Sequence, residues 1–184
     1  MLGDDFPEVL EGALAGSESA FARLYVDAHP PLLRYLRGMA PELAEDAASE
    51  TWLEVARGLD GFTGAEPAFR AWLFAIARRK VIDRIRYETR RPSSSWDDLD
   101  SVAPALRDVA DDVVEEDETR QALALVRTLP PDQAEAVLLR VVAGLDYADA
   151  ARVMDRSPGA VRVLVHRGLK RLQSLVVEMG GVTP

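Results

Sequence analysis

Apolar residues recur along this chain at the three- and four-residue spacing of an α-helix. Phe21, Leu24, Tyr25 and Ala28 form one such stripe, which continues through a run of leucines to Leu36. This spacing puts apolar side chains on a single face of a helix. Alternating strand patterns are nearly absent. The sequence therefore predicts an all-α protein whose helices pack through their apolar faces.

Three helices are expected in the first half, at residues 17–39, 41–59 and 67–90. Pro30 and Pro31 follow His29 inside the first of them and indicate a bend, because proline lacks the amide N–H that a helix needs. The run Asp60-Gly61-Phe62-Thr63-Gly64 predicts a loop before the third helix. That third helix is expected to turn inward Phe69, Leu73, Ile76, Ala77, Val81 and Ile85.

Four further helices are expected in the second half, at residues 119–128, 132–142, 146–154 and 158–172. Asp146 and Ser157 are the expected N-caps of the last two, and Pro158 suits the first helical position. Only about three residues join these two helices. Two short helices with so short a turn between them have the dimensions of a helix-turn-helix. The second half is therefore expected to be a small helical bundle that contains this motif.

Composition excludes several classes of protein. The chain has 184 residues, of which 48% are hydrophobic, so it can bury a core. It has no cysteine, which excludes disulfides and cysteine-ligated zinc. No segment approaches the roughly twenty apolar residues of a membrane span, so no membrane insertion is expected. The acidic N-terminus is unlike a signal peptide, and a cytoplasmic location is expected.

The residues also give no sign of an enzyme. There is no glycine-rich phosphate loop, no metal-binding cluster of histidines and carboxylates, and no evident nucleophile–base set. No cofactor and no metal are expected. The function is therefore sought in binding surfaces.

Charge is strongly segregated within a chain of net charge −9. Basic residues outnumber acidic ones eight to two over residues 70–91, and five to none over 156–171. Between them, residues 92–118 hold ten acids and one base. The serine- and proline-rich start of this stretch predicts a flexible acidic linker at 92–117, between domains at 1–91 and 118–184.

The last basic helix has two distinct faces. At 100 degrees per residue, Val161, Val165 and Leu172 share the side that would pack on the bundle. The other side is basic, as a recognition helix requires, because it offers cations to phosphates and donors to base edges in the major groove. The candidate DNA contacts here are Ser157, Gly159, Arg162, Val163, His166, Arg167, Lys170 and Arg171.

The basic helix of the first half carries aromatic residues among its cations. This combination suits a DNA strand whose bases have left the stack. The loop before the helix could form a pocket for one extruded base. The candidate contacts are Phe62, Thr63, Gly64, Arg78, Arg79, Lys80, Arg84 and Arg86.

Three classes of function remain open on these patterns. A promoter-recognition factor accounts for both basic helices and the acidic linker. A stand-alone helix-turn-helix regulator, with an N-terminal sensing or dimerising bundle, accounts for residues 146–172 but not for the first basic helix. A helical interaction module without a DNA role leaves both basic faces unexplained.

The two halves resemble the bacterial sigma-70 family of RNA polymerase sigma factors, specifically its extracytoplasmic-function (ECF) subfamily. The stretches AEDAASETWLEVARGLDGFTG and FRAWLFAIARRKVIDRIRYETRR are similar to sigma region 2. LPPDQ, GLDYADAA and SPGAVRVLVHRGLKRL are similar to the start, centre and end of sigma region 4. The order of these motifs, and the linker between them, match the family along nearly the whole chain.

The resemblance implies an alternative sigma factor that binds core RNA polymerase and directs promoter-specific initiation. The first domain would melt the minus-ten element, and the second would read the minus-thirty-five element and lean on the β flap. The linker would thread a polymerase channel, and an anti-sigma factor would hold the protein inactive. The residues implied for the β′ clamp helices are Asp46, Glu50, Trp52, Leu53 and Glu54.

Overall fold

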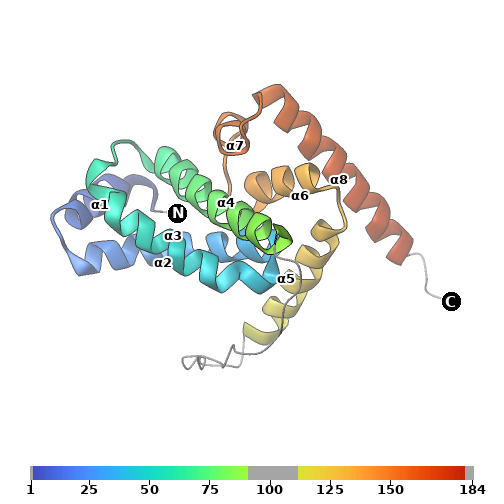
Figure 1. The fold of residues 1–184 in the computed structure, drawn as a ribbon, viewed down its shortest axis with the longest axis horizontal. Coiled ribbons are helices and arrows are strands. Elements are labelled where there is room, and N and C mark those ends of the chain that lie inside the picture. The colour runs from blue at the N-terminus through green and yellow to red at the C-terminus, as the bar shows by residue number, and fades with distance from the viewer. Residues whose placement is uncertain (1, 91–111, 181–184) are drawn as a thin grey trace.

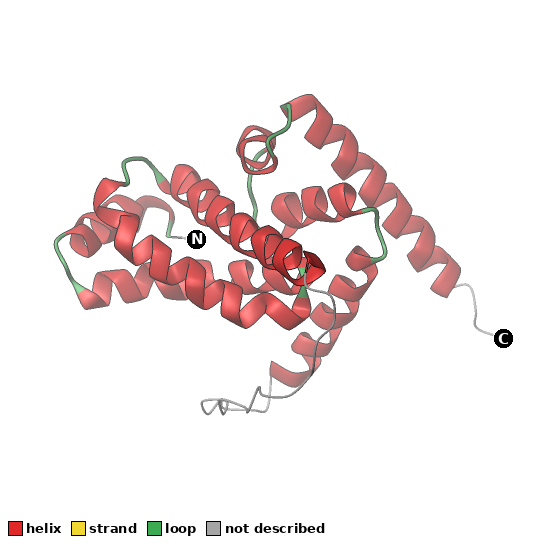
Figure 2. Cartoon of the chain, in the orientation of Figure 1, coloured by secondary structure: helices red, strands yellow, loops and turns green. Residues whose placement is uncertain are grey.

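The structure, a computed structural model, describes residues 2–90 and 112–180 (Figure 1). Within these two ranges every regular element is a helix and no strand occurs (Figure 2). The prediction of an all-α fold is confirmed. No helix in the described ranges has the length and apolarity needed to cross a membrane.

The first unit is a bundle of four helices: α1 (Phe6–Leu14), α2 (Glu18–Met39), α3 (Ala44–Gly58) and α4 (Glu66–Arg90). In this unit α1 packs on α2, α2 on α3, and α3 on α4. Short 3₁₀ turns precede α1, α3 and the loop before α4. Each of these helices buries its apolar stripe against a neighbour, as the helical spacing predicts.

The bend expected at Pro30 and Pro31 does not interrupt α2, which is helical through both prolines. Each proline removes one amide from the hydrogen-bond ladder of the helix. Burial of the neighbouring residues compensates, because Leu32 is fully buried and Leu33 nearly so. Tertiary packing therefore outweighs the local preference for a break.

The second unit contains α5 (Asp112–Arg127), α6 (Pro131–Val137), a π-helical turn η4 (Leu138–Val142), α7 (Tyr147–Met154) and α8 (Pro158–Gly180). Helix α5 thus begins inside the stretch 92–117 that was expected to be linker. The remainder of that stretch, up to residue 111, lies outside the described residues. Helix α8 also runs beyond Leu172, where the recognition motif ends.

Both N-caps expected in the second unit are confirmed. The carboxylate of Asp146 accepts a hydrogen bond of 2.7 Å from the amide of Asp149. The hydroxyl of Ser157 accepts one of 3.2 Å from the amide of Ala160. Between α7 and α8 the backbone of Asp155 is left-handed, with φ of 53°, which turns the chain sharply toward α8.

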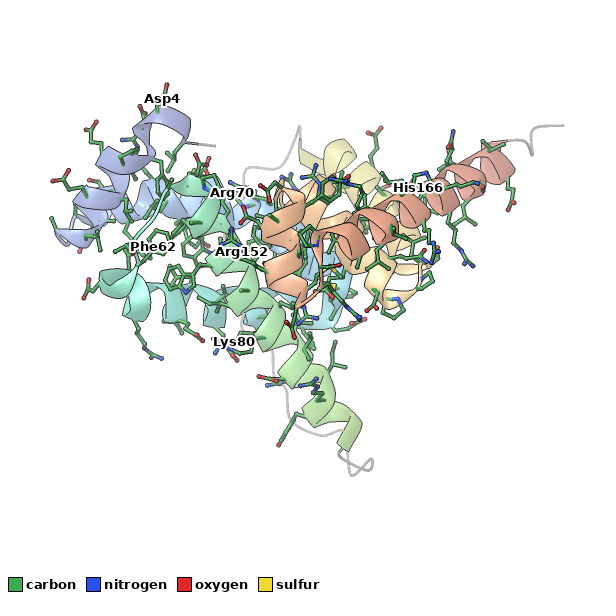
Figure 3. The ribbon with its side chains drawn as sticks, turned by 90° about the horizontal axis from the view of Figure 1, so that it is seen from above. Asp4, Phe62, Arg70, Lys80, Arg152 and His166 are labelled. Atoms are coloured by element: carbon green, nitrogen blue, oxygen red, sulfur yellow. The ribbon has the colours of Figure 1, made fainter. Side chains whose placement is uncertain are left out.

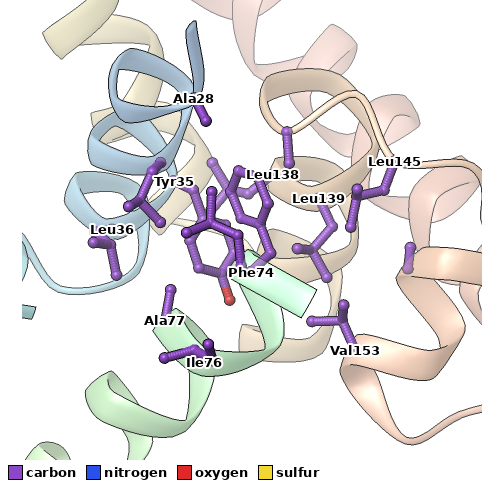
Figure 4. Packing of buried hydrophobic residues seen from close by; sticks show 14 of the residues in the cluster. Ala28, Tyr35, Leu36, Phe74, Ile76, Ala77, Leu138, Leu139, Leu145 and Val153 are labelled. Atoms are coloured by element: carbon purple, nitrogen blue, oxygen red, sulfur yellow. The ribbon is translucent and has the colours of Figure 1, made fainter. Parts of the chain in front are cut away.

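The two units pack against each other and share one continuous hydrophobic core. Helix α2 contacts α5 and η4, and α4 runs beside α7. Tyr35 and Phe74 of the first unit and Leu138 and Leu139 of the second are fully buried (Figure 4). The prediction of two helical bundles is confirmed, and their apposition is a feature that the sequence patterns did not indicate.

One residue of the expected inner face of α4 lies outside the core. Ile85 is 41% exposed, whereas Phe69, Leu73, Ile76, Ala77 and Val81 are buried. The inward stripe of α4 therefore ends at Val81, and residues 83–87 after it are solvent-exposed. The prediction for Ile85 was wrong because the helix continues past the elements that cover its inner face.

We expect Leu138→Ala to lower the free energy of unfolding by about 2–5 kcal/mol, because it removes a fully buried side chain and leaves a cavity. Urea denaturation followed by circular dichroism measures this. The control is Val177→Ala on the exposed side of α8, expected to change stability by no more than about 0.5 kcal/mol. Equal effects of the two changes would contradict the assigned core.

Candidate nucleic-acid interface

The outward face of α8 is accessible from its start to Arg171. Val161 and Val165 are buried against the bundle, as the periodicity predicted. Their spacing turns the opposite side outward, and His166 marks that side (Figure 3). The eight candidate contacts are all exposed: Ser157, Gly159, Arg162, Val163, His166, Arg167, Lys170 and Arg171.

The cations of this face have no carboxylate partner within 4 Å in the described part of the chain. This holds for Arg162, Arg167, Lys170 and Arg171. Arg156, just before the helix, differs because it pairs with Asp132 of α6 at 2.8 Å. The face is therefore available to an external anion, and the turn that leads into it is tied to the bundle.

Tyr147, at the start of α7, belongs to this interface and was not among the candidates. The guanidinium carbons of Arg140 and Arg162 lie over its ring, at 4.4 Å and 5.0 Å from the ring centre. Stacking on an aromatic face restricts the orientations of a guanidinium group. No sequence periodicity could reveal this contact, because it joins three separate elements.

The basic face of α4 is paired with carboxylates of α3. The ammonium of Lys80 lies 2.9 Å from Glu54 and 3.9 Å from Glu50, and Arg79 also pairs with Glu54. The hydrogen bond from Lys80 is the main cause that lowers the pKa of Glu54 below its ordinary value. Arg79 and Lys80, which are candidate DNA contacts, thus pair with Glu50 and Glu54, which are candidate polymerase contacts.

Arg78 points away from Arg79 and toward the second unit. Its Nε donates a hydrogen bond of 2.5 Å to the carboxylate of Glu135 in α6. Burial opposes the charge of Arg78, but the hydrogen bond and charge of Glu135 outweigh burial and raise the pKa of Arg78. This candidate contact is therefore engaged within the molecule. Arg86, nearer the end of α4, is exposed and lies 3.9 Å from Asp83 of its own helix, and Arg84 is exposed as well.

Phe62 anchors the loop before α4. Its ring stacks on Trp72 with centroids 5.3 Å apart and meets Phe69 edge-on at 5.6 Å. Thr63 and Gly64 are exposed beside it. A Cβ atom at Gly64 would lie 3.0 Å from Ala68 and 3.2 Å from the Phe62 ring, so the loop passes closely over this aromatic cluster.

Of the five polymerase candidates on α3, Glu54 is partly exposed and paired with Arg79 and Lys80, and the other four divide into two groups. Asp46, Glu50 and Leu53 are exposed, and the apolar Leu53 is 56% exposed. Trp52 is only 6% exposed, and its indole N–H donates to Nδ1 of His29 at 3.2 Å. The indole therefore belongs to the core of the first unit and offers little surface to a partner.

No cluster of three or more potential metal ligands occurs among residues 2–90 and 112–180. A helix-turn-helix whose basic face has no carboxylate partner in the described part of the chain is typical of a DNA-binding protein.

Two family models match the chain. Residues 24–91 match the family described as Sigma-70 region 2, and residues 119–172 match Sigma-70, region 4. The first range runs from within α2 through α4, and the second runs from within α5 to within α8, so each includes one of the two basic faces.

Curated relatives agree with these matches. The ECF RNA polymerase sigma factor BldN of Streptomyces coelicolor is 35% identical over 92% of this chain, which spans 65% of BldN. ShbA of Streptomyces griseus is 34% identical over 89% of this chain and 91% of its own. SigD of Mycobacterium tuberculosis is 30% identical over 98% of this chain and 88% of SigD. The chain belongs to the ECF family of RNA polymerase sigma factors.

Solved structures share the fold. CnrH, in complex with the cytosolic domain of CnrY, has a TM-score of 0.67 and 23% identity, over 94% of this chain and 97% of CnrH. The sigma factor RpoE of Bartonella quintana, in complex with the anti-sigma factor NepR, has a TM-score of 0.66 and 24% identity. The match covers 85% of this chain and 96% of RpoE.

The contact of α3 with α4 predicts the titration of one carboxyl group. We expect Glu54 to titrate below an ordinary glutamate and to return toward the ordinary pKa in Lys80→Gln, because the main hydrogen-bond donor is removed. Its contribution to stability is present above the ordinary pKa and is lost as pH falls through the lowered one. Carboxyl NMR titration measures the shift. Lys170→Gln is the control, and an equal change there would contradict the contact.

Proposed function

We propose that this chain is an alternative sigma factor that binds core RNA polymerase and directs promoter-specific initiation in the cytoplasm. It performs no chemistry of its own, and the polymerase supplies catalysis. The observation that carries the proposal is the pair of basic faces, one in each matched sigma region. A single DNA element would need only one of them.

Helix α8 is the proposed reader of the minus-thirty-five element. Arg167 and Lys170 are its phosphate contacts, and Arg162, Val163 and His166 face the base edges of the major groove. Unpaired cations support this role, because binding DNA then breaks no internal ion pair. Ser157, Gly159 and Arg171 complete the surface at the two ends of the contact.

Helix α4 and the loop before it are proposed to open and hold the minus-ten element. Thr63 and Gly64 would approach an extruded base, and Phe62 would support the loop from beneath. Arg79 and Lys80 would exchange the carboxylates of α3 for phosphates, which is an exchange of exposed ion pairs at small cost. Arg84 and Arg86 extend the same cationic track along the strand.

The exposed side of α3 is the proposed contact with the β′ clamp helices. Leu53 would supply apolar area, with Asp46, Glu50 and Glu54 as a surrounding acidic rim. Trp52 supports this surface from the core. The second unit is proposed to lean on the β flap, and an anti-sigma factor is the proposed inhibitor, since RpoE of Bartonella quintana shares the fold and is solved with one.

Transcription with purified components tests the proposal. The chain is mixed with core RNA polymerase and a library of promoter DNA, and transcript starts are mapped. Specific initiation that needs both proteins is expected. Tight binding to a duplex without polymerase, and no transcripts, would favour the stand-alone helix-turn-helix regulator.

We expect Arg167→Ala and Lys170→Ala each to weaken promoter binding by the holoenzyme. Each should flatten the slope of log affinity against log salt by about one unit, because one phosphate contact and its released counterion are lost. Fluorescence anisotropy over a salt series measures the slope. Arg120→Ala, which breaks an exposed pair with Asp117 in α5, is the control. An unchanged slope in both variants would exclude these side chains from the interface.

We expect Tyr147→Leu to reduce promoter affinity about twofold to thirtyfold, because a stacked guanidinium is stabilised by about 0.5–2 kcal/mol. Tyr147→Phe keeps the ring and should retain most of the affinity. Competition between specific and random duplexes measures both variants. If Tyr147→Phe lowers promoter affinity as much as Tyr147→Leu does, the tyrosine hydroxyl is responsible, and the stacking that orients Arg162 is not.

A further inference from the structure

One tyrosine ring is shared by two arginines that come from different elements. Tyr147 begins α7, whereas Arg140 belongs to the π-helical turn η4 and Arg162 to α8. The guanidinium carbons of the two arginines lie 4.4 Å and 5.0 Å from the centre of the ring. In the described part of the chain neither arginine has a carboxylate within 4 Å. The aromatic ring is therefore the contact that these two cations have in common.

Arg140 is held in place from the side of the bundle. Its guanidinium group donates a hydrogen bond to the carbonyl of Leu145, which follows η4. Its Nε is buried and has no hydrogen-bond partner among the described residues. A buried N–H without a partner costs free energy. Arg140 therefore keeps its orientation through Leu145 and through the ring of Tyr147, at the expense of Nε.

Arg162 is exposed and keeps its donors free. It makes no hydrogen bond to the part of the chain that the structure describes, so its contact with Tyr147 restricts the plane of the guanidinium group while the N–H groups stay available. The other cations of the outward face have neither a ring contact nor a carboxylate partner within the described ranges: Arg167, Lys170 and Arg171. On this face Arg162 is thus the cation that another side chain orients.

A contact to a base needs a fixed orientation, whereas a contact to a phosphate does not. A mobile cation can serve a phosphate as a point charge. Guanine presents O6 and N7 side by side in the major groove, and an arginine donates to both when its plane is aligned with the base. Orientation before binding reduces the entropy that this contact costs. Arg162 also lies near the N-terminus of α8, from which a recognition helix reaches base edges.

We propose that Arg140 and Tyr147 are positioning residues that orient Arg162 toward one guanine of the minus-thirty-five element. The inference rests on the proposed function and names the base that one side chain reads. Arg162 contacts DNA, Tyr147 fixes the plane of its guanidinium group, and Arg140 fixes the ring of Tyr147. Arg140 itself makes no contact with DNA. A residue that precedes both helices of the helix-turn-helix thereby contributes to base preference.

Selection by the holoenzyme, from promoter fragments with a randomised minus-thirty-five element, measures base preference at each position. Arg162→Ala identifies the position concerned, because the preference for guanine there should fall about fivefold to 150-fold. Arg140→Met and Tyr147→Leu should each lower the preference at the same position about twofold to thirtyfold, and leave the other positions unchanged. Tyr147→Phe keeps the ring and should retain the preference.

Two controls separate positioning from a direct contact and from a general loss of structure. Arg156→Met breaks an exposed ion pair with Asp132 in the turn before α8, and should leave the preference for guanine unchanged. In a chain that already carries Arg162→Ala, Arg140→Met should have no further effect on this preference, because it acts through Arg162. Circular dichroism checks that each variant keeps its helix content.

The salt dependence of promoter binding gives a second readout. Arg140→Met should leave the slope of log affinity against log salt unchanged, because no phosphate contact is lost. A slope that flattens by about one unit would make Arg140 a phosphate contact and overturn its positioning role.

Two further results would overturn the inference. Either the preference for guanine is unchanged in Arg162→Ala or in folded Arg140→Met, or it falls equally at every position. If Arg140→Met does not fold, Tyr147→Leu decides by the same criteria. In each case specific transcription by the wild type leaves the proposed function intact. If the wild type and core polymerase give no specific transcripts, the proposed function fails and this inference fails with it.

Discussion

The partly buried ion pair of Arg78 with Glu135 joins the two helical units and involves an arginine of the basic helix α4. A guanidinium and a carboxylate are removed from water only where each satisfies the other, so the contact is specific to one placement of the two units. Around it, the shared core of α2, α4, η4 and α7 provides the apolar burial that holds the units together. The same arginine belongs to the basic helix that suits DNA. Its charge can serve the internal contact or an external phosphate, but not both at one time.

The two basic faces differ in how much internal pairing they must give up. The cations of α8 have no carboxylate partners in the described part of the chain, whereas Arg79 and Lys80 of α4 are held by Glu54. Helix α8 can therefore bind a duplex without rearrangement. Binding of DNA by α4, as proposed, would first require Arg79 and Lys80 to leave the carboxylate of Glu54.

Local features of the fold could be predicted from the sequence, and contacts between distant residues could not. The caps by Asp146 and Ser157 and the two faces of α8 depend on neighbours within a few residues. Arg78 and Glu135 are 57 positions apart, and no periodicity indicates such a pair. The resemblance to sigma region 2 implied a polymerase contact at Trp52, whereas the burial of its ring beside His29 could be found only in the structure.

We propose that the two units, each with one DNA-binding face, pack together in the free chain and lie apart in the complex with polymerase and promoter. The absence of cysteine allows two spin labels to be placed on exposed positions, with Arg57→Cys on α3 and Gln173→Cys on α8. Pulsed electron paramagnetic resonance then measures the distance between the units. The account predicts one short distance in the free chain and a longer one with core polymerase and promoter DNA. The same distance in both states would contradict it.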